Sequence, residues 1–333
     1  MGLNLAIAGV TGAVGQEFLR ILEERDFPFD SIRMLASSRS VGKKVELKGK
    51  EYLVEEMTHD SFERVNIALF SAGASRSREF CPSAVKAGAV VVDNSSAYRM
   101  DPEVPLVIPE INPQKIKENK GIIANPNCST IIAIVPVWPL HKANPVKRMV
   151  VSTYQAASGA GQSAMVELEE QSREILAGKK PTIKIFPYQI AFNVFSHNSK
   201  LESNGYNEEE MKMVRETHKI FDCPEIAITC TCIRIPVFRA HSESINLEFT
   251  DPITPDQVRD LLSTAPGVSL IDDRKNNRFP MPLDATGKDD VFVGRIRQDE
   301  SIPDNRGINI WVSGDQIRKG AALNAVQIAE RLL

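Results

Sequence analysis

The chain has 333 residues, too many for one typical hydrophobic core, so we expect two domains. Its 40 basic and 43 acidic residues give a net charge of −3, and no basic patch interleaved with aromatic residues occurs, which argues against a nucleic-acid partner. No apolar run is long enough to span a bilayer, and five irregularly spaced cysteines favour a reducing compartment. We therefore expect a cytoplasmic protein without a membrane partner or a metal site.

Short apolar strands alternate with helices in the first part of the chain. We expect strands over residues 3–8, 32–36, 68–70, 89–93 and 122–124, and helices over residues 14–24 and 77–87. This alternation predicts an α/β domain of the Rossmann type, with a parallel, doubly wound sheet.

The pattern changes after residue 127. We expect strands over 149–154, 226–237 and 241–249, and helices over 161–177, 208–221 and 315–333. Long alternating runs predict an α+β domain with a mainly antiparallel sheet and one wet face. The sequence thus predicts a first domain over 1–127, completed by a C-terminal helix in 314–333, and a second domain over 128–313.

A glycine-rich loop, Gly9-Val10-Thr11-Gly12-Ala13-Val14-Gly15, joins the first strand to the first helix. Glycines at this point let the backbone approach the pyrophosphate of a dinucleotide at the helix N-terminus. The spacing differs from the common G-x-G-x-x-G form, and a plain tight turn is the alternative. A second small-residue turn, Ser71-Ala72-Gly73, follows the third expected strand.

The second strand runs into Ser37-Ser38-Arg39-Ser40, where a site for NAD usually has an Asp or Glu. Hydroxyl groups and a guanidinium suit the 2′-phosphate of NADP instead. The alternative is an exposed loop arginine without a function.

Cys128 follows an Asn-Pro turn and opens an expected helix in Asn125-Pro126-Asn127-Cys128-Ser129-Thr130. Backbone amides at a helix start stabilise a thiolate or an oxyanion. Taken alone, a cysteine is more often a small buried core residue than a nucleophile. Of five histidines, His241 is the best candidate for a base, because Pro236 and Phe238 indicate a bend that would aim Arg234 and His241 at one cleft. Taken alone, a histidine is more often structural, and Arg234 would be an ordinary surface strand residue.

Two further segments carry polar residues of interest. Gln155 leaves a strand into the small-residue loop that ends at Gly161, and Glu209 and Lys212 lie in the first turns of a helix. Acidic residues at a helix start also have a plain electrostatic explanation.

These segments occur in the order found in aspartate-β-semialdehyde dehydrogenases, and the chain resembles that family from end to end, including Gly314 to Arg318. The resemblance implies an NADP-binding first domain and a second domain for catalysis, substrate binding and dimerisation, with a homodimer as the assembly. It implies catalytic roles for Cys128, as nucleophile, for His241, as general acid and base, and for Gln155. It implies substrate contacts from Arg99, Gln155, Glu209, Lys212 and Arg234. The nucleotide contacts that motif and resemblance together predict are Gly9, Thr11, Gly12, Ala13, Val14, Gly15, Ser37, Ser38, Arg39, Ser40, Ser71, Ala72, Gly73, Ser158, Gly159, Pro187 and Gln316.

The implied reaction is NADPH-dependent reduction of L-4-aspartyl phosphate to L-aspartate 4-semialdehyde and phosphate through a Cys128 thioester, in lysine, methionine and threonine biosynthesis. One alternative is reduction of N-acetyl-γ-glutamyl phosphate, whose acylated amine has no need of a carboxylate such as Glu209. A second alternative is a dinucleotide-binding protein without catalysis, but such a relative should have lost Cys128 or His241.

Overall fold

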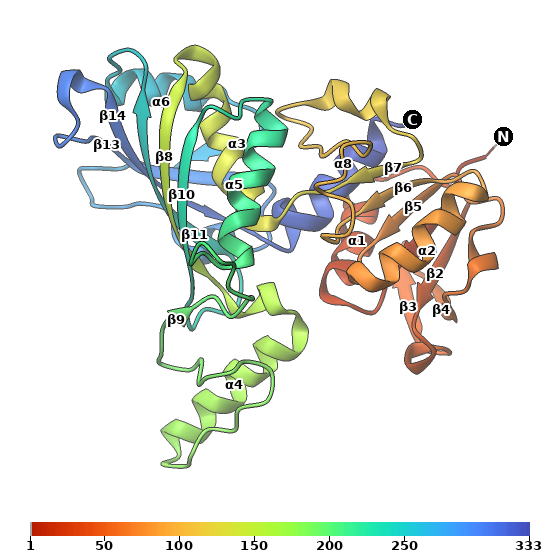
Figure 1. Cartoon of the computed structure of the whole chain (residues 1–333). Coiled ribbons are helices and arrows are strands. Elements are labelled where there is room, and N and C mark those ends of the chain that lie inside the picture. Colours follow the sequence, from red (N-terminus) through yellow and green to blue (C-terminus); the bar gives the residue numbers. More distant parts are fainter. Residues whose placement is uncertain (1) are drawn as a thin grey trace. The chain divides into compact units, whose positions relative to one another are not determined.

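A computed structural model describes residues 2–333 of the chain, so Met1 lies outside it (Figure 1). The chain divides into two compact units, one formed by Met1–Asn127 with Ala321–Leu333 and the other by Cys128–Gly320. Residues 314–320, which the sequence places with the terminal helix, belong to the second unit. The reason is local: Gly314 ends a strand of that unit, and the Gly320 N–H donates to the Asp315 carbonyl.

The first unit is a doubly wound α/β domain. Its strands are β1 (Asn4–Ala8), β2 (Ser31–Ala36), β3 (Lys44–Leu47), β4 (Lys50–Glu56), β5 (Ile67–Phe70), β6 (Val90–Asp93) and β7 (Ile122–Ala124). Its helices are α1 (Ala13–Glu24), α2 (Ala74–Lys86) and α8 (Leu323–Glu330), with short 3₁₀ turns η1 (Ser38–Ser40), η2 (His59–Phe62) and η3 (Pro113–Glu118). The strand order is β3-β4-β2-β1-β5-β6-β7, and all neighbours are parallel except β3 and β4.

Both faces of this sheet are buried, which explains its nearly continuous apolar strands. On β1, Leu5 and Ile7 belong to the core shared with α1 and α8, whereas Ala6 and Ala8 belong to the core shared with α2. The side chains of successive strand residues point to opposite faces, so a single strand supplies both cores.

Two features of the fold differ from the sequence-based expectation. The β3–β4 hairpin is absent from the predicted strands, because its residues are mostly charged and exposed and give little hydrophobic signal. Residues 315–333 form no continuous helix: a turn at Asp315 precedes the π-helical segment η6 (Arg318–Ala322) and then α8. The Asp315 carboxylate accepts bonds from the amides of Ile317 and Arg318, which stabilises that turn.

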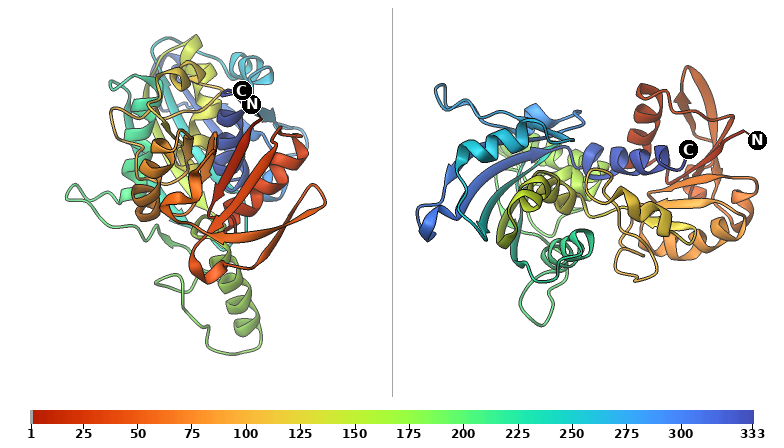
Figure 2. Two further views of the ribbon diagram at one scale, coloured as in Figure 1. Left: turned by 90° about the vertical axis from the view of Figure 1, so that its right-hand side faces the viewer. Right: turned by 90° about the horizontal axis from the view of Figure 1, so that it is seen from above.

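The second unit contains a mixed sheet with helices over one of its faces (Figures 1 and 2). Its strands are β8 (Val146–Gln155), β9 (Phe195–Ser196), β10 (Ala227–Arg234), β11 (His241–Phe249), β12 (Val268–Leu270), β13 (Val291–Gln298) and β14 (Gly307–Gly314). Its helices are α3 (Cys128–Ala143), α4 (Gln162–Leu176), α5 (Glu208–Phe221), α6 (Pro255–Ser263) and α7 (Pro282–Ala285), with 3₁₀ turns η4 (Ala157–Ala160) and η5 (Pro303–Asn305). The order is β12-β13-β14-β11-β8-β10-β9.

Most strand pairs in this sheet are antiparallel, in agreement with the expected fold class. The exceptions are β12 with β13 and β8 with β10, which run parallel. The chain leaves β8 through α4, β9 and α5 before it enters β10, and a long crossover of this kind is what a parallel pair requires. Alternation of apolar and polar residues indicates that one face of a strand is exposed to solvent, but it does not indicate the direction of the strand. The sequence therefore does not predict that β8 and β10 run parallel.

An arm formed by α4 and the segment that follows it extends away from the sheet of the second unit (Figure 1). It has a small apolar core of its own, which includes Leu168, Phe186 and Ile190. The same sheet places the ends of β8, β10 and β11 side by side: Gln155 pairs with Arg234, and Tyr154 pairs with Ser242. Residues expected at one site therefore come to one edge of the sheet.

Candidate active site and dinucleotide pocket

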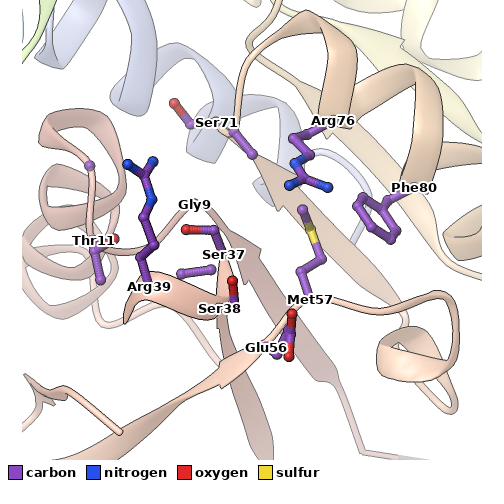
Figure 3. Close-up of a pocket in the computed structure, with 13 residues that line it drawn as sticks. Gly9, Thr11, Ser37, Ser38, Arg39, Glu56, Met57, Ser71, Arg76 and Phe80 are labelled. Carbon is purple, nitrogen blue, oxygen red and sulfur yellow. The ribbon is translucent and has the colours of Figure 1, made fainter. Parts of the chain in front are cut away.

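A pocket of about 300 Å³ lies at the carboxyl ends of β1, β2 and β5 in the first unit (Figure 3). Ligands of open α/β sheets bind at this edge, where strand order reverses. The pocket is lined by eight of the residues predicted to bind a nucleotide, namely Gly9, Thr11, Gly12, Ser37, Ser38, Arg39, Ser71 and Ala72.

Two glycines of the loop are required by close backbone contacts. Gly9 has φ +91°, and a Cβ at this residue would lie 2.3 Å from the Ser71 carbonyl oxygen. A Cβ at Gly15 would lie 2.2 Å from the Gly9 carbonyl oxygen. These contacts fix how α1 meets β1 and β5, and so keep the first turn of α1 against the pocket.

The other five predicted residues of this unit do not line the pocket; they are Ala13, Val14, Gly15, Ser40 and Gly73. Ser40 contacts the lining residue Thr11, since their hydroxyl oxygens lie 3.3 Å apart. Sequence reasoning missed five lining residues, Ala36, Glu56, Met57, Arg76 and Phe80. Arg76 is a second cation in the pocket, in addition to Arg39 (Figure 3). Its guanidinium lies 5.8 Å from the centre of the Phe80 ring. Because Glu56 ends the unpredicted strand β4 and Met57 follows it, no motif indicated them.

In the second unit, Cys128 is the first residue of α3, and its Sγ lies 3.7 Å from Nε2 of His241. His241 is the first residue of β11 and is fully buried. Its Nδ1 accepts a hydrogen bond from the backbone N–H of Ala156 at 3.0 Å. Burial in the first place, and then the positive charge of Arg234, lower the pKa of His241 to about 3.

A polar chain continues from this pair toward α5. The Gln155 side-chain amide donates to the Ser129 hydroxyl and, at 3.4 Å, to Glu209 Oε1. Lys212 Nζ donates to Glu209 Oε2 at 3.1 Å. Glu209 is buried although it carries a carboxylate, and Asn207 caps the helix that holds it. Gln155 is also buried, and its Oε1 has no partner among the described residues.

Arg234 ends β10 on the other side of Gln155. Its Nη1 donates to the Ala156 carbonyl at 3.2 Å, and its Nη2 donates to His197 Nε2 at 2.8 Å. Burial and then the charge of Arg234 lower the pKa of His197 to about 4. Sequence reasoning missed His197, because only the pairing of β9 with β10 brings it to this place: its N–H donates to the Cys232 carbonyl.

The remaining predicted site residues are spread over both units. Arg99 belongs to the first unit, where its guanidinium donates to the carbonyls of Asn125 and Asn94. Ser158 and Gly159 lie in η4, and a Cβ at Gly159 would lie 3.2 Å from His241 Cε1. Gln316 donates to the Ser158 hydroxyl and accepts from the Ala240 N–H at 2.8 Å. Pro187 is an exposed residue of the arm.

Among residues 2–333, no group of three or more His, Cys, Asp or Glu side chains is arranged to hold a metal ion. No helix in that range is long and apolar enough to cross a membrane. What the second unit offers is a thiol at a helix start beside an imidazole nitrogen, with Arg234, Lys212 and Glu209 near it. Such a site suits covalent attack by sulfur on the carbonyl group of a small substrate that carries charges of both signs.

A Rossmann-type unit combined with a second unit that carries a cysteine–histidine pair defines a dinucleotide-dependent oxidoreductase of the aldehyde dehydrogenase class. Comparison with family models is specific: residues 4–119 match the NAD-binding domain of semialdehyde dehydrogenases, and residues 137–319 match their dimerisation domain. The chain belongs to the semialdehyde dehydrogenase family, among the aspartate-semialdehyde dehydrogenases. It is accordingly an oxidoreductase of amino-acid biosynthesis.

Relatives with this name match nearly the whole chain. The aspartate-semialdehyde dehydrogenases of Prochlorococcus marinus and Synechocystis sp. are each 55% identical over 331 residues, which is 99% of this chain and 96% and 97% of theirs. Among solved structures, aspartate semialdehyde dehydrogenase II of Vibrio cholerae, complexed with ASA, has a TM-score of 0.96 at 46% identity. That match covers 100% of this chain and 98% of the other.

Proposed function

We propose that the chain reduces L-4-aspartyl phosphate to L-aspartate 4-semialdehyde and phosphate, with Cys128 as the nucleophile. The observation that supports this most strongly is the approach of Cys128 Sγ to His241 Nε2 at the start of α3. The thiolate sulfur attacks the acyl carbon, the bond from that carbon to the phosphate oxygen breaks, and an acyl-thioester with free phosphate results. NADPH, when bound, supplies the hydride that reduces the thioester to the aldehyde.

Charged side chains of the site are proposed to bind the carboxylate, the ammonium and the phosphate of the substrate. The Arg234 guanidinium suits a two-pronged pair with the substrate α-carboxylate. The Glu209 carboxylate suits the free ammonium, and Gln155 is placed by Glu209 and Ser129 to hold the substrate near the sulfur. Lys212 and Arg99 are the cations proposed to bind phosphate. A buried carboxylate beside the thiol favours the free amine of an aspartyl group over the acylated amine of the N-acetylglutamyl alternative.

NADP is the proposed cofactor. The Ser37, Ser38 and Arg39 side chains follow β2 and line the pocket of the first unit, and Arg76 adds a second guanidinium to it. Two guanidiniums and two hydroxyls suit a 2′-phosphate. The backbone around Gly9 and Gly12 suits the pyrophosphate. Ser158, Gly159, Pro187 and Gln316 remain proposed contacts for the nucleotide from the second unit.

The assembly we propose is a cytoplasmic homodimer. The family model of the second unit is that of a dimerisation domain. Large apolar side chains on the arm support the proposal, since Leu176 is 79% and Phe192 is 63% exposed. Apolar patches of this kind mark interaction sites. No disulfide links any of the five cysteines, all of which lie within residues 2–333, and this suits a reducing compartment.

The proposal is tested by phosphate-dependent oxidation of L-aspartate 4-semialdehyde, with NADP⁺ and NAD⁺ compared side by side. We expect turnover only with phosphate present and a clear preference for NADP⁺. The variant Arg39→Ala should lower kcat/KM for NADP⁺ by roughly tenfold or more, whereas kcat/KM for NAD⁺ should stay nearly unchanged. Equal efficiency with both cofactors would reject the NADP assignment. Faster turnover of N-acetyl-L-glutamate 5-semialdehyde would reject the substrate.

A further inference from the structure

The Arg234 guanidinium is held at both of its terminal nitrogens. Its Nη1 donates to the Ala156 carbonyl at 3.2 Å, and its Nη2 donates to His197 Nε2 at 2.8 Å. The carbon between them lies 5.8 Å from the centre of the Phe186 ring. Arg234 is buried, and its Nε has no hydrogen-bond partner among the described residues. A guanidinium has five N–H donors in one plane, so these contacts fix the direction in which its remaining N–H groups, Nε–H among them, face a ligand.

The contacts from Phe186 and His197 come from the arm and from the strand that follows it. His197 comes directly after β9, whose Phe195 pairs with Arg234 on β10. The His197 N–H donates to the Cys232 carbonyl at 2.8 Å, which continues this pairing by one residue. The Phe186 and Phe195 rings meet edge to face, with their centres 5.8 Å apart. The imidazole therefore reaches Arg234 from a backbone that is itself fixed against β10.

The hydrogen bonds of His197 determine which ring nitrogen carries its proton. Its low pKa of about 4 makes the ring neutral at neutral pH, and a neutral imidazole has one N–H and one nitrogen with a lone pair. Two donors face the ring: Arg234 Nη2 at Nε2, and the Ser199 N–H at 3.2 Å from Nδ1. The bond from Arg234 is the shorter and has a charged donor, which makes it roughly twice as strong as a neutral one. The lone pair therefore lies on Nε2, and Nδ1–H donates to the Ser199 hydroxyl at 3.1 Å.

Ser199 links His197 to the start of α5. Its hydroxyl oxygen accepts from the Glu209 N–H at 3.1 Å, and its hydroxyl donates to Asn207 Oδ1 at 3.2 Å. Asn207 is the N-cap of α5, and Glu209 lies in the first turn of that helix. His197 and Ser199 thus connect the guanidinium proposed to bind the substrate carboxylate with the helix start that carries the carboxylate proposed to bind the substrate ammonium.

We infer that His197 is a positioning residue for substrate recognition, which in its Nδ1–H form accepts from Arg234 and directs the guanidinium toward the α-carboxylate of the substrate. The inference deepens the proposed function and rests on it, because Arg234 is there the carboxylate-binding group. Loss of the imidazole leaves a buried N–H of Arg234 without its acceptor and removes one of the two hydrogen bonds that hold the guanidinium plane. The contact between Cys128 and His241 stays in place, so the loss should weaken substrate binding more than turnover.

The first test is steady-state kinetics of the full-length protein with aspartate semialdehyde, NADP⁺ and saturating phosphate. His197→Ala should raise KM by roughly tenfold or more and lower kcat by less than about threefold. His197→Gln should recover most of the loss in KM, because its side-chain amide oxygen can accept from Arg234 in place of Nε2. His218→Ala is the matched control, since His218 Nε2 bonds to the Ile226 carbonyl in the same unit, and its KM should stay unchanged. An unchanged KM in His197→Ala, or a KM in His197→Gln as high as in His197→Ala, would overturn the inference.

The second test separates positioning of Arg234 from a merely structural role. Arg234→Lys keeps the positive charge but loses the planar fork that both His197 and a carboxylate bind. In this background, His197→Ala should lower kcat/KM for aspartate semialdehyde by less than about threefold, against roughly tenfold or more in the wild-type background. If His197 only supported the fold of the arm, its removal would cost the same in both backgrounds. Equal losses would therefore overturn the inference.

The third test is ¹⁵N NMR of the full-length protein with labelled histidine, at neutral pH and without substrate. His197→Gln assigns the His197 signals by their loss. We expect a neutral ring with its proton on Nδ1, whereas signals of an imidazolium, or of a ring protonated on Nε2, would overturn the inference. This spectrum needs no turnover. If the wild type fails to oxidise aspartate semialdehyde, the proposed function fails, and the spectrum still decides whether His197 accepts from Arg234.

Discussion

Cys128 differs from the other four cysteines in its surroundings. Burial raises the pKa of the Cys81, Cys230 and Cys232 thiols, and burial together with Glu225 raises that of Cys223. Cys128 is partly exposed, lies at the first residue of α3 and faces an imidazole nitrogen. The sequence predicted its helix start from the Asn-Pro turn, but the distance to His241 depends on how β11 and α3 pack.

We expect alkylation to discriminate between these thiols. With a limiting amount of iodoacetamide at neutral pH, Cys128 should react roughly tenfold or more faster than the other cysteines, because only the thiolate is the nucleophile. Peptide mapping after timed quenching measures the five rates. Aspartate semialdehyde should protect Cys128 selectively. Similar rates at all five positions would contradict an activated thiol.

Glu243 is a buried acidic residue that sequence reasoning did not single out. It lies on β11 two residues after His241, where the strand register places it opposite Thr153 on β8 and Val312 on β14. Its side chain is fully buried, and neither carboxyl oxygen has a hydrogen-bond partner among the described residues. Burial raises the pKa of Glu243 well above 4.5, so the folded protein holds this group as a neutral acid.

This predicts a stability change with pH. An unfolded chain releases the Glu243 proton above its pKa of about 4.5, whereas the folded chain retains it. The stability that protonated Glu243 contributes to the folded state is therefore fully present below that pH. It is lost at about 1.4 kcal/mol per pH unit as the pH rises toward the folded-state pKa. Glu243→Gln should remove this loss, so its free energy of unfolding should exceed that of the wild type at neutral pH but not at pH 4. Urea titrations across this range measure both, and parallel pH dependence of the two proteins would contradict the assignment.

At the scale of elements, the corner between β8 and η4 organises the second unit's site. Gln155 ends β8, Ala156 contacts both Arg234 and His241, and Gly159 lies against the same two side chains. The order of these residues along the chain could be seen in the sequence, as could the bend between Arg234 and His241. What the sequence could not show is that β8 has β10 as a parallel neighbour and β11 as an antiparallel one, and this pairing creates the site.

Gly159→Ala tests this corner. The new Cβ would lie 2.8 Å from Arg234 Nη1 and 3.2 Å from His241 Cε1, so one of these groups must move. The Arg234 side chain is the more flexible, and we expect KM for aspartate semialdehyde to rise by roughly tenfold with a smaller change in kcat. Steady-state kinetics with saturating phosphate measure both. Gly178→Ala, in the arm, has open space around the new Cβ but a φ of +71°, so it controls for the general cost of a strained Gly→Ala exchange away from Arg234 and His241. An unchanged KM in Gly159→Ala would contradict the placement of Arg234.

For the whole molecule, the fold class followed from alternating strands and helices, whereas three parts of the fold did not. The β3–β4 hairpin, the parallel β8–β10 pair and the interrupted terminal helix all depend on contacts between distant segments or on local capping by Asp315. The pocket residues Arg76 and Glu56 escaped notice for the same reason, because strand order brings them beside Gly9.

The exposed apolar side chains of the arm predict its part in self-association. Leu176→Glu combined with Phe192→Asp places two charges on the proposed interface and should raise the dimer dissociation constant by roughly a hundredfold. Sedimentation velocity over a dilution series measures this. Leu283→Glu, at an equally exposed position outside the arm, is the control. A dimer as stable as the wild type would place the interface elsewhere.

The central claim is that Cys128 carries the acyl group as a thioester. The direct measurement is intact-protein mass spectrometry after acid quench of the protein with aspartate semialdehyde and NADP⁺ but no phosphate. The account predicts one aspartyl group per chain, mapped to the peptide of Cys128, formed with a matching burst of NADPH and released when phosphate is added. Cys128→Ala should show neither adduct nor burst while still binding NADP⁺. A burst without an adduct, or an adduct on another residue, would contradict the account.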